Sequence, residues 1–161
     1  MCTHRGFTLI EILIVIIIIG ITVGFALIAF GDFGDSRRIL FSAEQLLNTL
    51  KLAQQQAILE TSTLGLRIDN NSYQILKLHN LSTWEPLSNK GIFKITYFPK
   101  NTVMTLKTSN KTLQGSPAII INSTGDMTPF TLGLGTNEET VITLLTGHRN
   151  GSFNLSTAKT K

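Results

Sequence analysis

The chain begins with a long apolar run that contains a single acid. From Phe7 to Phe30 there are 24 residues, and Glu11 is the only one that carries charge. The charge-free part, Ile12 to Phe30, is 19 residues long. At about 1.5 Å per residue it nearly crosses a hydrocarbon core of about 30 Å. In lipid a single span must satisfy its own backbone hydrogen bonds, so only a helix fits. The sequence therefore predicts a transmembrane helix over residues 7–30.

A charged Glu11 near the hydrocarbon core of a membrane carries a free-energy cost. A charged side chain in the hydrocarbon costs roughly 2.5–3.5 kcal/mol on insertion scales. A sequence that needed only an anchor has no reason to keep it, so we interpret Glu11 as a functional group with a partner. The alternative is that Glu11 merely extends to the interface near the start of the span.

A short leader precedes the run, and its register is informative. The residues at the junction are Gly6-Phe7-Thr8-Leu9-Ile10-Glu11. This motif resembles that of type IV prepilins and pseudopilins, in which a membrane peptidase cuts after the glycine and methylates the new amino terminus. The resemblance implies cleavage between Gly6 and Phe7, N-methylation of Phe7, and a leader of residues 1–6. It also implies that Glu11 pairs with the terminal amine of a neighbouring subunit during assembly.

Elementary electrostatics agrees with that assembly role. Opposite charges attract strongly in a low dielectric, whereas each alone is costly to bury. A rival interpretation is a secretory signal cleaved near Gly24-Phe25-Ala26, although the apolar run is longer than is usual for such a signal. Basic residues do not settle the orientation, because Arg5 lies before the run and Arg37 and Arg38 after it. The resemblance implies a single pass through the bacterial inner membrane, with the carboxy-terminal domain in the periplasm.

A second helical segment is expected over residues 31–60. Gly31–Asp35 breaks the apolar run, and Asp35 or Ser36 is expected to cap a second helical segment. Six apolar residues then recur at spacings of 4, 3, 4, 3 and 4, which indicates one apolar seam that packs on a sheet of the same chain. These residues are Ile39, Ala43, Leu46, Leu50, Ala53 and Ala57.

The sequence pattern of residues 61–161 is typical of a small β domain. Two alternating segments, 63–69 and 72–78, flank Asn70-Asn71 and predict a hairpin. Further strands are expected at 92–98, 102–107, 118–122, 130–134, 140–146 and 152–155. Short strands at this spacing predict an antiparallel β-sandwich, so the fold class is α+β, a long hydrophobic and amphipathic helix followed by a sandwich, as in pilins.

Composition argues against several functions. The net charge of +4 is mild and is not the footprint of a dedicated nucleic-acid binder. The only cysteine, Cys2, lies in the leader, so the processed chain has no disulfide. His79 and His148 are expected in loops without metal-ligand spacing. No catalytic motif, metal site or cofactor is predicted. Trp84 either anchors a partner or covers the edge of the core.

Four segments narrow the family further. They are residues 44–57, 64–73, 84–87 and 125–132, and their order resembles that of the H-type minor pseudopilins of type II secretion. The resemblance implies a non-enzymatic subunit near the tip of a short pseudopilus that helps to export folded proteins. The implied partners are the other tip pseudopilins, the major pseudopilin and the prepilin peptidase. A minor type IV pilin of the FimT/FimU kind, some of which bind DNA, and a secreted β-sandwich protein remain alternatives.

Overall fold

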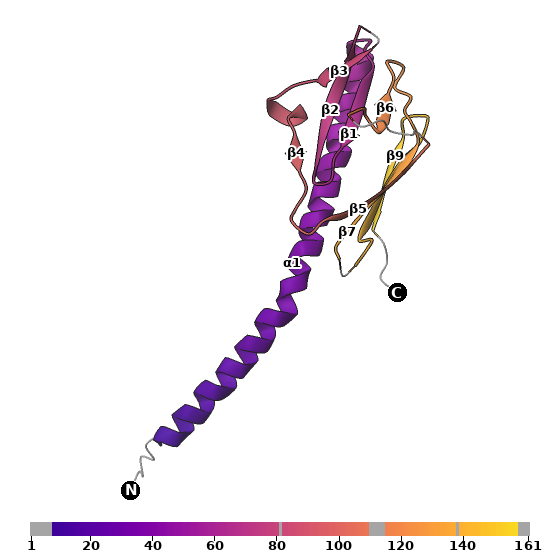
Figure 1. Cartoon of the computed structure of the whole chain (residues 1–161). Coiled ribbons are helices and arrows are strands. Elements are labelled where there is room, and N and C mark those ends of the chain that lie inside the picture. The colour runs from indigo at the N-terminus through magenta and orange to yellow at the C-terminus, as the bar shows by residue number, and fades with distance from the viewer. Residues whose placement is uncertain (1–7, 81, 110–114, 138, 158–161) are drawn as a thin grey trace. The chain divides into compact units, whose positions relative to one another are not determined.

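The computed structural model of the chain describes residues 8–80, 82–109, 115–137 and 139–157, with the backbone alone for residues 27–33. The chain divides into two compact units, Met1–Asp35 and Ser36–Lys161. Each unit is considered by itself. Figure 1 shows the order of the elements along the chain, with the long helix first and the strands after it.

Helix α1 runs without interruption from Leu9 to Leu59 and is 51 residues long. The prediction that Asp35 or Ser36 caps a second helical segment is therefore wrong, because the helix continues through the end of the apolar run at Gly31–Asp35. Glycine inside a helix costs about 1 kcal/mol relative to alanine, but it removes no hydrogen-bond donor. Without a proline in this segment, the two glycines weaken the helix locally and do not end it. The boundary between the two compact units nonetheless falls at Asp35–Ser36.

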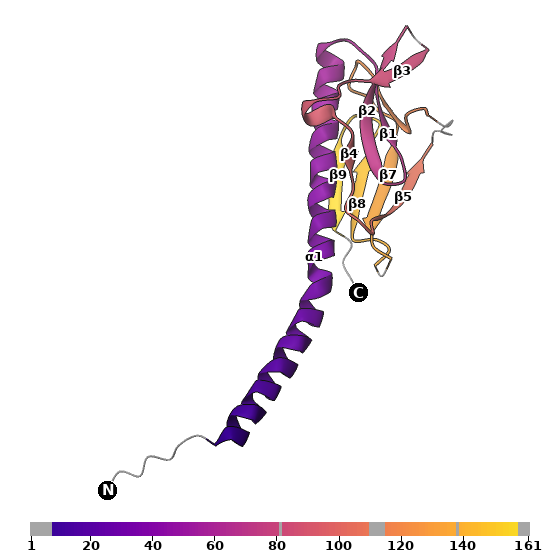
Figure 2. The same ribbon diagram turned by 60° about the vertical axis from the view of Figure 1, so that its left-hand side comes forward.

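The predicted apolar seam on α1 is confirmed. All six of its residues are at most 1% exposed. They join one core cluster with buried residues from both sheets, including Leu66 and Leu132. Figure 2 shows this part of α1 running alongside the strands of its own unit. The seam therefore packs on the chain's own sheets, as expected.

The first sheet contains β1 (Leu64–Ile68), β2 (Ser72–His79), β3 (Thr83–Pro86), β4 (Thr96–Tyr97) and β6 (Ile119–Ile121). Its order is β3-β2-β1-β6, and β4 pairs separately with β2. The predicted hairpin is confirmed, with Leu64 opposite Lys77 in an antiparallel register. The amide of Asp69 donates to the carbonyl of Ser72 at 2.8 Å and closes the turn.

The second sheet contains β5 (Val103–Thr108), β7 (Phe130–Gly135), β8 (Thr143–Gly147) and β9 (Phe153–Thr157), in the order β5-β7-β8-β9. In the part of the chain that the structure describes, the strands of both sheets pair antiparallel, which confirms the α+β class. One predicted strand is largely wrong. Residues 92–98 form the 3₁₀ helix η1 (Gly91–Phe93) and only then the two-residue β4. Strand β3 was not predicted, because Pro86 interrupts its pattern.

Trp84 lies over the first sheet. A Cβ placed on Gly65 would lie 3.0 Å from a ring carbon of Trp84 and 2.5 Å from Pro117. Glycine at position 65 thus allows both side chains to approach the strand backbone, as close approach often requires. Trp84 is half-buried, and this contact favours the interpretation that it covers the edge of the core.

Candidate membrane and assembly segment

The first turn of α1 contains Glu11. The carbonyl oxygen of Thr8 accepts hydrogen bonds from the amides of Glu11 and Ile12, at 3.0 and 3.4 Å. An acid in the first turn of a helix interacts favourably with the helix dipole, by about 0.3–1 kcal/mol at exposed sites. Gly6 and Phe7, the predicted cleavage and methylation sites, lie outside the described residues. The structure therefore places Glu11 in the first turn of a helix, and in the sequence it is the fifth residue after the predicted cut.

The apolar surface that follows Glu11 is not covered by the chain itself. Residues Leu9–Ala26 have a mean hydropathy of 2.9, and none of this window is buried. Exposure is not confined to one stripe, since Leu13, Ile16 and Ile18 are all more than half exposed. A helix that is apolar on all sides needs lipid or other helices around it. By length and composition this segment suits a membrane span.

Thr22 is the polar residue in the middle of this segment, and its hydroxyl is satisfied locally. It donates to the carbonyl oxygens of Ile18 and Ile19, at 3.0 and 2.9 Å. In lipid an unsatisfied hydroxyl is costly, and back-bonding to the preceding turn removes that cost. Thr22 is therefore compatible with hydrocarbon surroundings.

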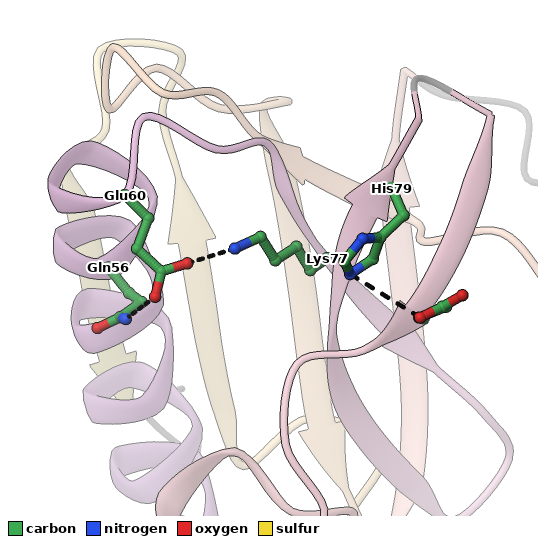
Figure 3. A network of polar contacts seen from close by, with 5 residues as sticks. Gln56, Glu60, Lys77 and His79 are labelled. Atoms are coloured by element: carbon green, nitrogen blue, oxygen red, sulfur yellow. Dashed lines mark hydrogen bonds and ion pairs between the residues drawn. The ribbon is translucent and has the colours of Figure 1, made fainter.

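A polar network joins the end of α1 to β2 in the second unit. Lys77 donates to Glu60 and makes an ion pair with it at 2.5 Å, and the Gln56 amide donates to the other carboxylate oxygen (Figure 3). The hydrogen bond from Lys77, and then that from Gln56, lowers the pKa of Glu60. On the same strand, the imidazole of His79 lies 3.8 Å from the carboxylate of Glu85. The network fastens the helix end to the sheet.

Sequence reasoning missed this network. Glu60 and Lys77 are 17 residues apart, so no helix or strand periodicity connects them. Only the hairpin register brings Lys77 back to the level of the helix end. The prediction that His79 lies in a loop is wrong, because it is the last residue of β2. His148 does lie in a turn, where its amide donates to the carbonyl of Ser152 at 2.9 Å.

Possible metal ligands do not gather in the part of the chain that the structure describes. No group of three His, Cys, Asp or Glu residues is found there. Asp69, at the turn between β1 and β2, lies 3.2 Å from Nε of Arg67. It belongs to the hairpin turn, as its sequence context indicated.

A groove of about 430 Å³ opens beside the first turns of the part of α1 that belongs to the second unit. Arg37, Arg38, Phe41 and Gln45 line it from α1, and residues 97–99 line it from the end of β4. Phe41 and Tyr97 are 69% and 65% exposed. No local sequence pattern predicts this groove, because its two sides are more than 50 residues apart in the chain.

Comparisons with known proteins agree with these features. Residues 1–27 match the model of the prokaryotic N-terminal methylation motif, and residues 42–151 match that of the type II transport protein GspH. The type II secretion system protein H of Pseudomonas aeruginosa is 29% identical over 145 residues, which cover 83% of this chain and 84% of that protein. Protein H of Escherichia coli is 27% identical over 157 residues, which cover 94% and 92%.

Solved structures share the fold. The minor pseudopilin EpsH from the type 2 secretion system of Vibrio cholerae superposes with a TM-score of 0.67 at 20% identity, over 77% of this chain and 99% of that chain. The solution structure of Escherichia coli GspH gives a TM-score of 0.64 at 18% identity, over 77% and 91%. The GspH model covers more than half of the chain, including the core of the β domain. The chain therefore belongs to the GspH family, the H-type minor pseudopilins, which are structural subunits.

Proposed function

We propose that this chain is the H-type minor pseudopilin of a type II secretion system. It is anchored in the bacterial inner membrane by the start of α1, exposes its β domain to the periplasm, and assembles near the tip of the pseudopilus to help export folded proteins. The observation that carries the proposal is an unburied apolar helix, with Glu11 in its first turn, joined to a domain of the GspH family.

The apolar surface of the helix meets two environments in succession. Before assembly, lipid covers the apolar residues of 9–26, and after assembly neighbouring pseudopilin helices cover them. Both environments are apolar, so the exchange requires little net change in the hydrophobic free energy. The direction of assembly must then come from interactions that differ between the two states.

Glu11 provides such a difference. After cleavage between Gly6 and Phe7, the new amine of Phe7 is a cation in an apolar setting. Glu11 is the complementary anion, and a neighbouring subunit in the correct register neutralises both charges. A wrong register leaves both ions unpaired, which is unfavourable in a low dielectric. The partners that follow from this role are the major pseudopilin, the other tip pseudopilins and the prepilin peptidase.

The function is tested in a strain that lacks this chain. Expression of the intact chain should restore export of the folded substrates, and the mature protein should begin at methylated Phe7 by mass spectrometry. Gly6→Val should accumulate at the unprocessed size and fail to restore export. A mature protein that begins after Ala26 would contradict the prepilin interpretation. A salt-sensitive DNA gel shift, with normal export in the deletion strain, would favour the alternative of a DNA-binding minor pilin.

A further inference from the structure

The groove beside α1 combines cations with exposed aromatic rings. Arg37 and Arg38 lie on its helical side, with Phe41 one turn further along. Tyr97 faces them from the end of β4. Both rings are mostly exposed, whereas the neighbouring Phe98 is only 4% exposed and packs on Tyr73 at a ring separation of 5.3 Å. Phe98 therefore belongs to the core and forms the buried part of the groove lining. Phe41 and Tyr97 are exposed and can contact another surface.

The lining of the groove is basic. None of its lining residues, all of them described, is acidic. The segment from Pro86 to Gly125 contains five lysines and no Asp or Glu. Two of these lysines, Lys94 and Lys100, are exposed and flank Tyr97 in the sequence. Aromatic rings interleaved with basic side chains are typical of protein surfaces that meet the headgroup layer of an anionic membrane.

The chain also holds this groove close to the predicted membrane span. Arg37 follows Phe30, the last residue of the apolar run, by only seven residues. Seven residues reach about 25 Å when fully extended and about 10 Å as a helix. Whatever the arrangement of the two units, this short connection gives the groove a high effective concentration at the membrane surface.

We propose that this groove docks on the anionic phospholipid headgroups of the membrane that holds the span. Arg37 and Arg38 bind lipid phosphate oxygens, for which planar guanidinium groups are well suited. Phe41 and Tyr97 lie at the level of the interface, with their rings toward the acyl chains. This inference rests on the membrane anchoring in the proposed function. It assigns the groove a role before assembly, when the domain is held down on the membrane and other subunits have not yet reached it.

The test uses the full-length chain in nanodiscs. One set of discs contains phosphatidylcholine alone, and the other also contains phosphatidylglycerol. Both carry a small fraction of lipid with a gadolinium chelate on its headgroup. The chain has two tyrosines, so ¹³C-tyrosine labelling follows Tyr97 at the groove and the buried Tyr73 as an internal reference. We expect paramagnetic relaxation of Tyr97 to be stronger in discs with phosphatidylglycerol and to weaken with added salt, with a smaller change at Tyr73.

Two double variants separate the groove from general charge. Arg37→Gln with Arg38→Gln should sharply weaken the dependence on phosphatidylglycerol, since each basic residue near an anionic surface strengthens binding about fivefold. Lys51→Gln with Arg149→Gln removes the same charge from exposed positions outside the groove and should preserve that dependence. An unchanged Tyr73 signal verifies folding of both variants.

Three outcomes would overturn the inference. Equal paramagnetic relaxation of Tyr97 in the two kinds of disc would show that the groove does not bind anionic lipid. The groove would then be a candidate binding site for a protein partner. Equal loss in the two double variants would show a general charge effect. A chain that does not enter the discs would overturn the anchoring in the proposed function, and this failure is recognised separately because no protein then purifies with the discs.

Discussion

The side-chain amide of Gln54 donates a hydrogen bond to the carbonyl oxygen of Gly125, at 2.7 Å and across 71 residues of sequence. The same nitrogen donates to the carbonyl oxygen of Gly151 at 3.1 Å. One helical side chain thus fastens two turns, the one before β7 and the one between β8 and β9. We call Gln54, Gly125 and Gly151 the glutamine clamp. It complements the apolar seam, because it holds loops that the seam does not cover.

The glutamine clamp predicts an unequal response of two glycines that both have positive φ. Gly151 has φ of +79°, and an added Cβ would overlap the Gln54 amide and lie 2.5 Å from the Gly125 carbonyl oxygen. Gly115 has φ of +90° and no atom within 4 Å of an added Cβ. Gly115→Ala should lower the free energy of unfolding by about 1–2 kcal/mol, which is the backbone cost of a side chain at positive φ. Gly151→Ala should lower it clearly more, because it also disrupts the hydrogen bonds of the clamp. Urea unfolding of the full chain in detergent measures the difference, and equal losses would exclude the clamp.

A second pair of glycines tests the packing of the β7–β8 pair. A Cβ on Gly147 would overlap the ring of Phe130, whereas one on Gly133 would make an ordinary contact with Leu144 at 3.5 Å. We expect Gly147→Ala to destabilise the domain by about 1–3 kcal/mol through overpacking. Gly133→Ala should be much milder, and Phe130→Leu should relieve part of the Gly147→Ala effect in the double variant. Additive losses would contradict the proposed contact.

The ion pair between Glu60 and Lys77 predicts a pH dependence. Because the folded state lowers the pKa of Glu60 below its ordinary value of 4.5, the stabilisation is present above that value. It is lost as the pH falls through the lower pKa of the folded state. Glu60→Gln should therefore lose stability at pH 7 and much less at acid pH. Glu44→Gln, an equal charge change on the exposed face of α1, is the control. The free energy of unfolding of both variants, measured at pH 7 and at acid pH, tests this prediction. The same pH dependence for Glu60→Gln and Glu44→Gln would contradict it.

The division of the chain at Asp35–Ser36 predicts an independent domain. A fragment from Asp35 onward should be soluble and monomeric at low concentration, because it keeps the whole apolar seam and omits the apolar run. Its circular dichroism should show mostly β structure with a helical contribution from residues 36–59. Analytical ultracentrifugation of the fragment checks that it is monomeric. Aggregation, or a spectrum dominated by helix, would show that the seam is not covered by the chain's own sheets.

Glu11 is expected to act in assembly and not in folding. Glu11→Leu should still be cleaved after Gly6 and should insert more easily, by up to roughly 2.5–3.5 kcal/mol. Export and crosslinking to other pseudopilins should nevertheless fall, because a neighbour's terminal amine loses its partner. Thr22→Val, which also removes a polar group from the span, serves as the control and should leave both unchanged. Normal export and crosslinking in Glu11→Leu, at matched protein level, would show that Glu11 has no assembly role.

Local patterns predicted much of this fold. The spacing of Ile39 to Ala57 marked the buried helical face, and Asn70-Asn71 between two alternating segments marked the β1–β2 hairpin, because both signals repeat within a few residues. The cap at Asp35 or Ser36 was wrongly predicted, since glycine propensity is a weak local effect that a continuous hydrogen-bond ladder overrides. Segment 92–98 was wrongly predicted as one strand, because its alternation does not reveal which residues find a pairing partner.

The apolar run, the place of Glu11 within it and the seam that must be buried all follow from local composition and periodicity, because these patterns act over neighbouring residues. Which distant groups meet depends instead on how the chain packs in three dimensions. Gln54 and Gly125, Glu60 and Lys77, and Arg37 and Tyr97 share no spacing that a helix or strand repeat could reveal. Their proximity depends on strand order, register and the docking of the helix on two sheets, and these follow from the packing of the whole core.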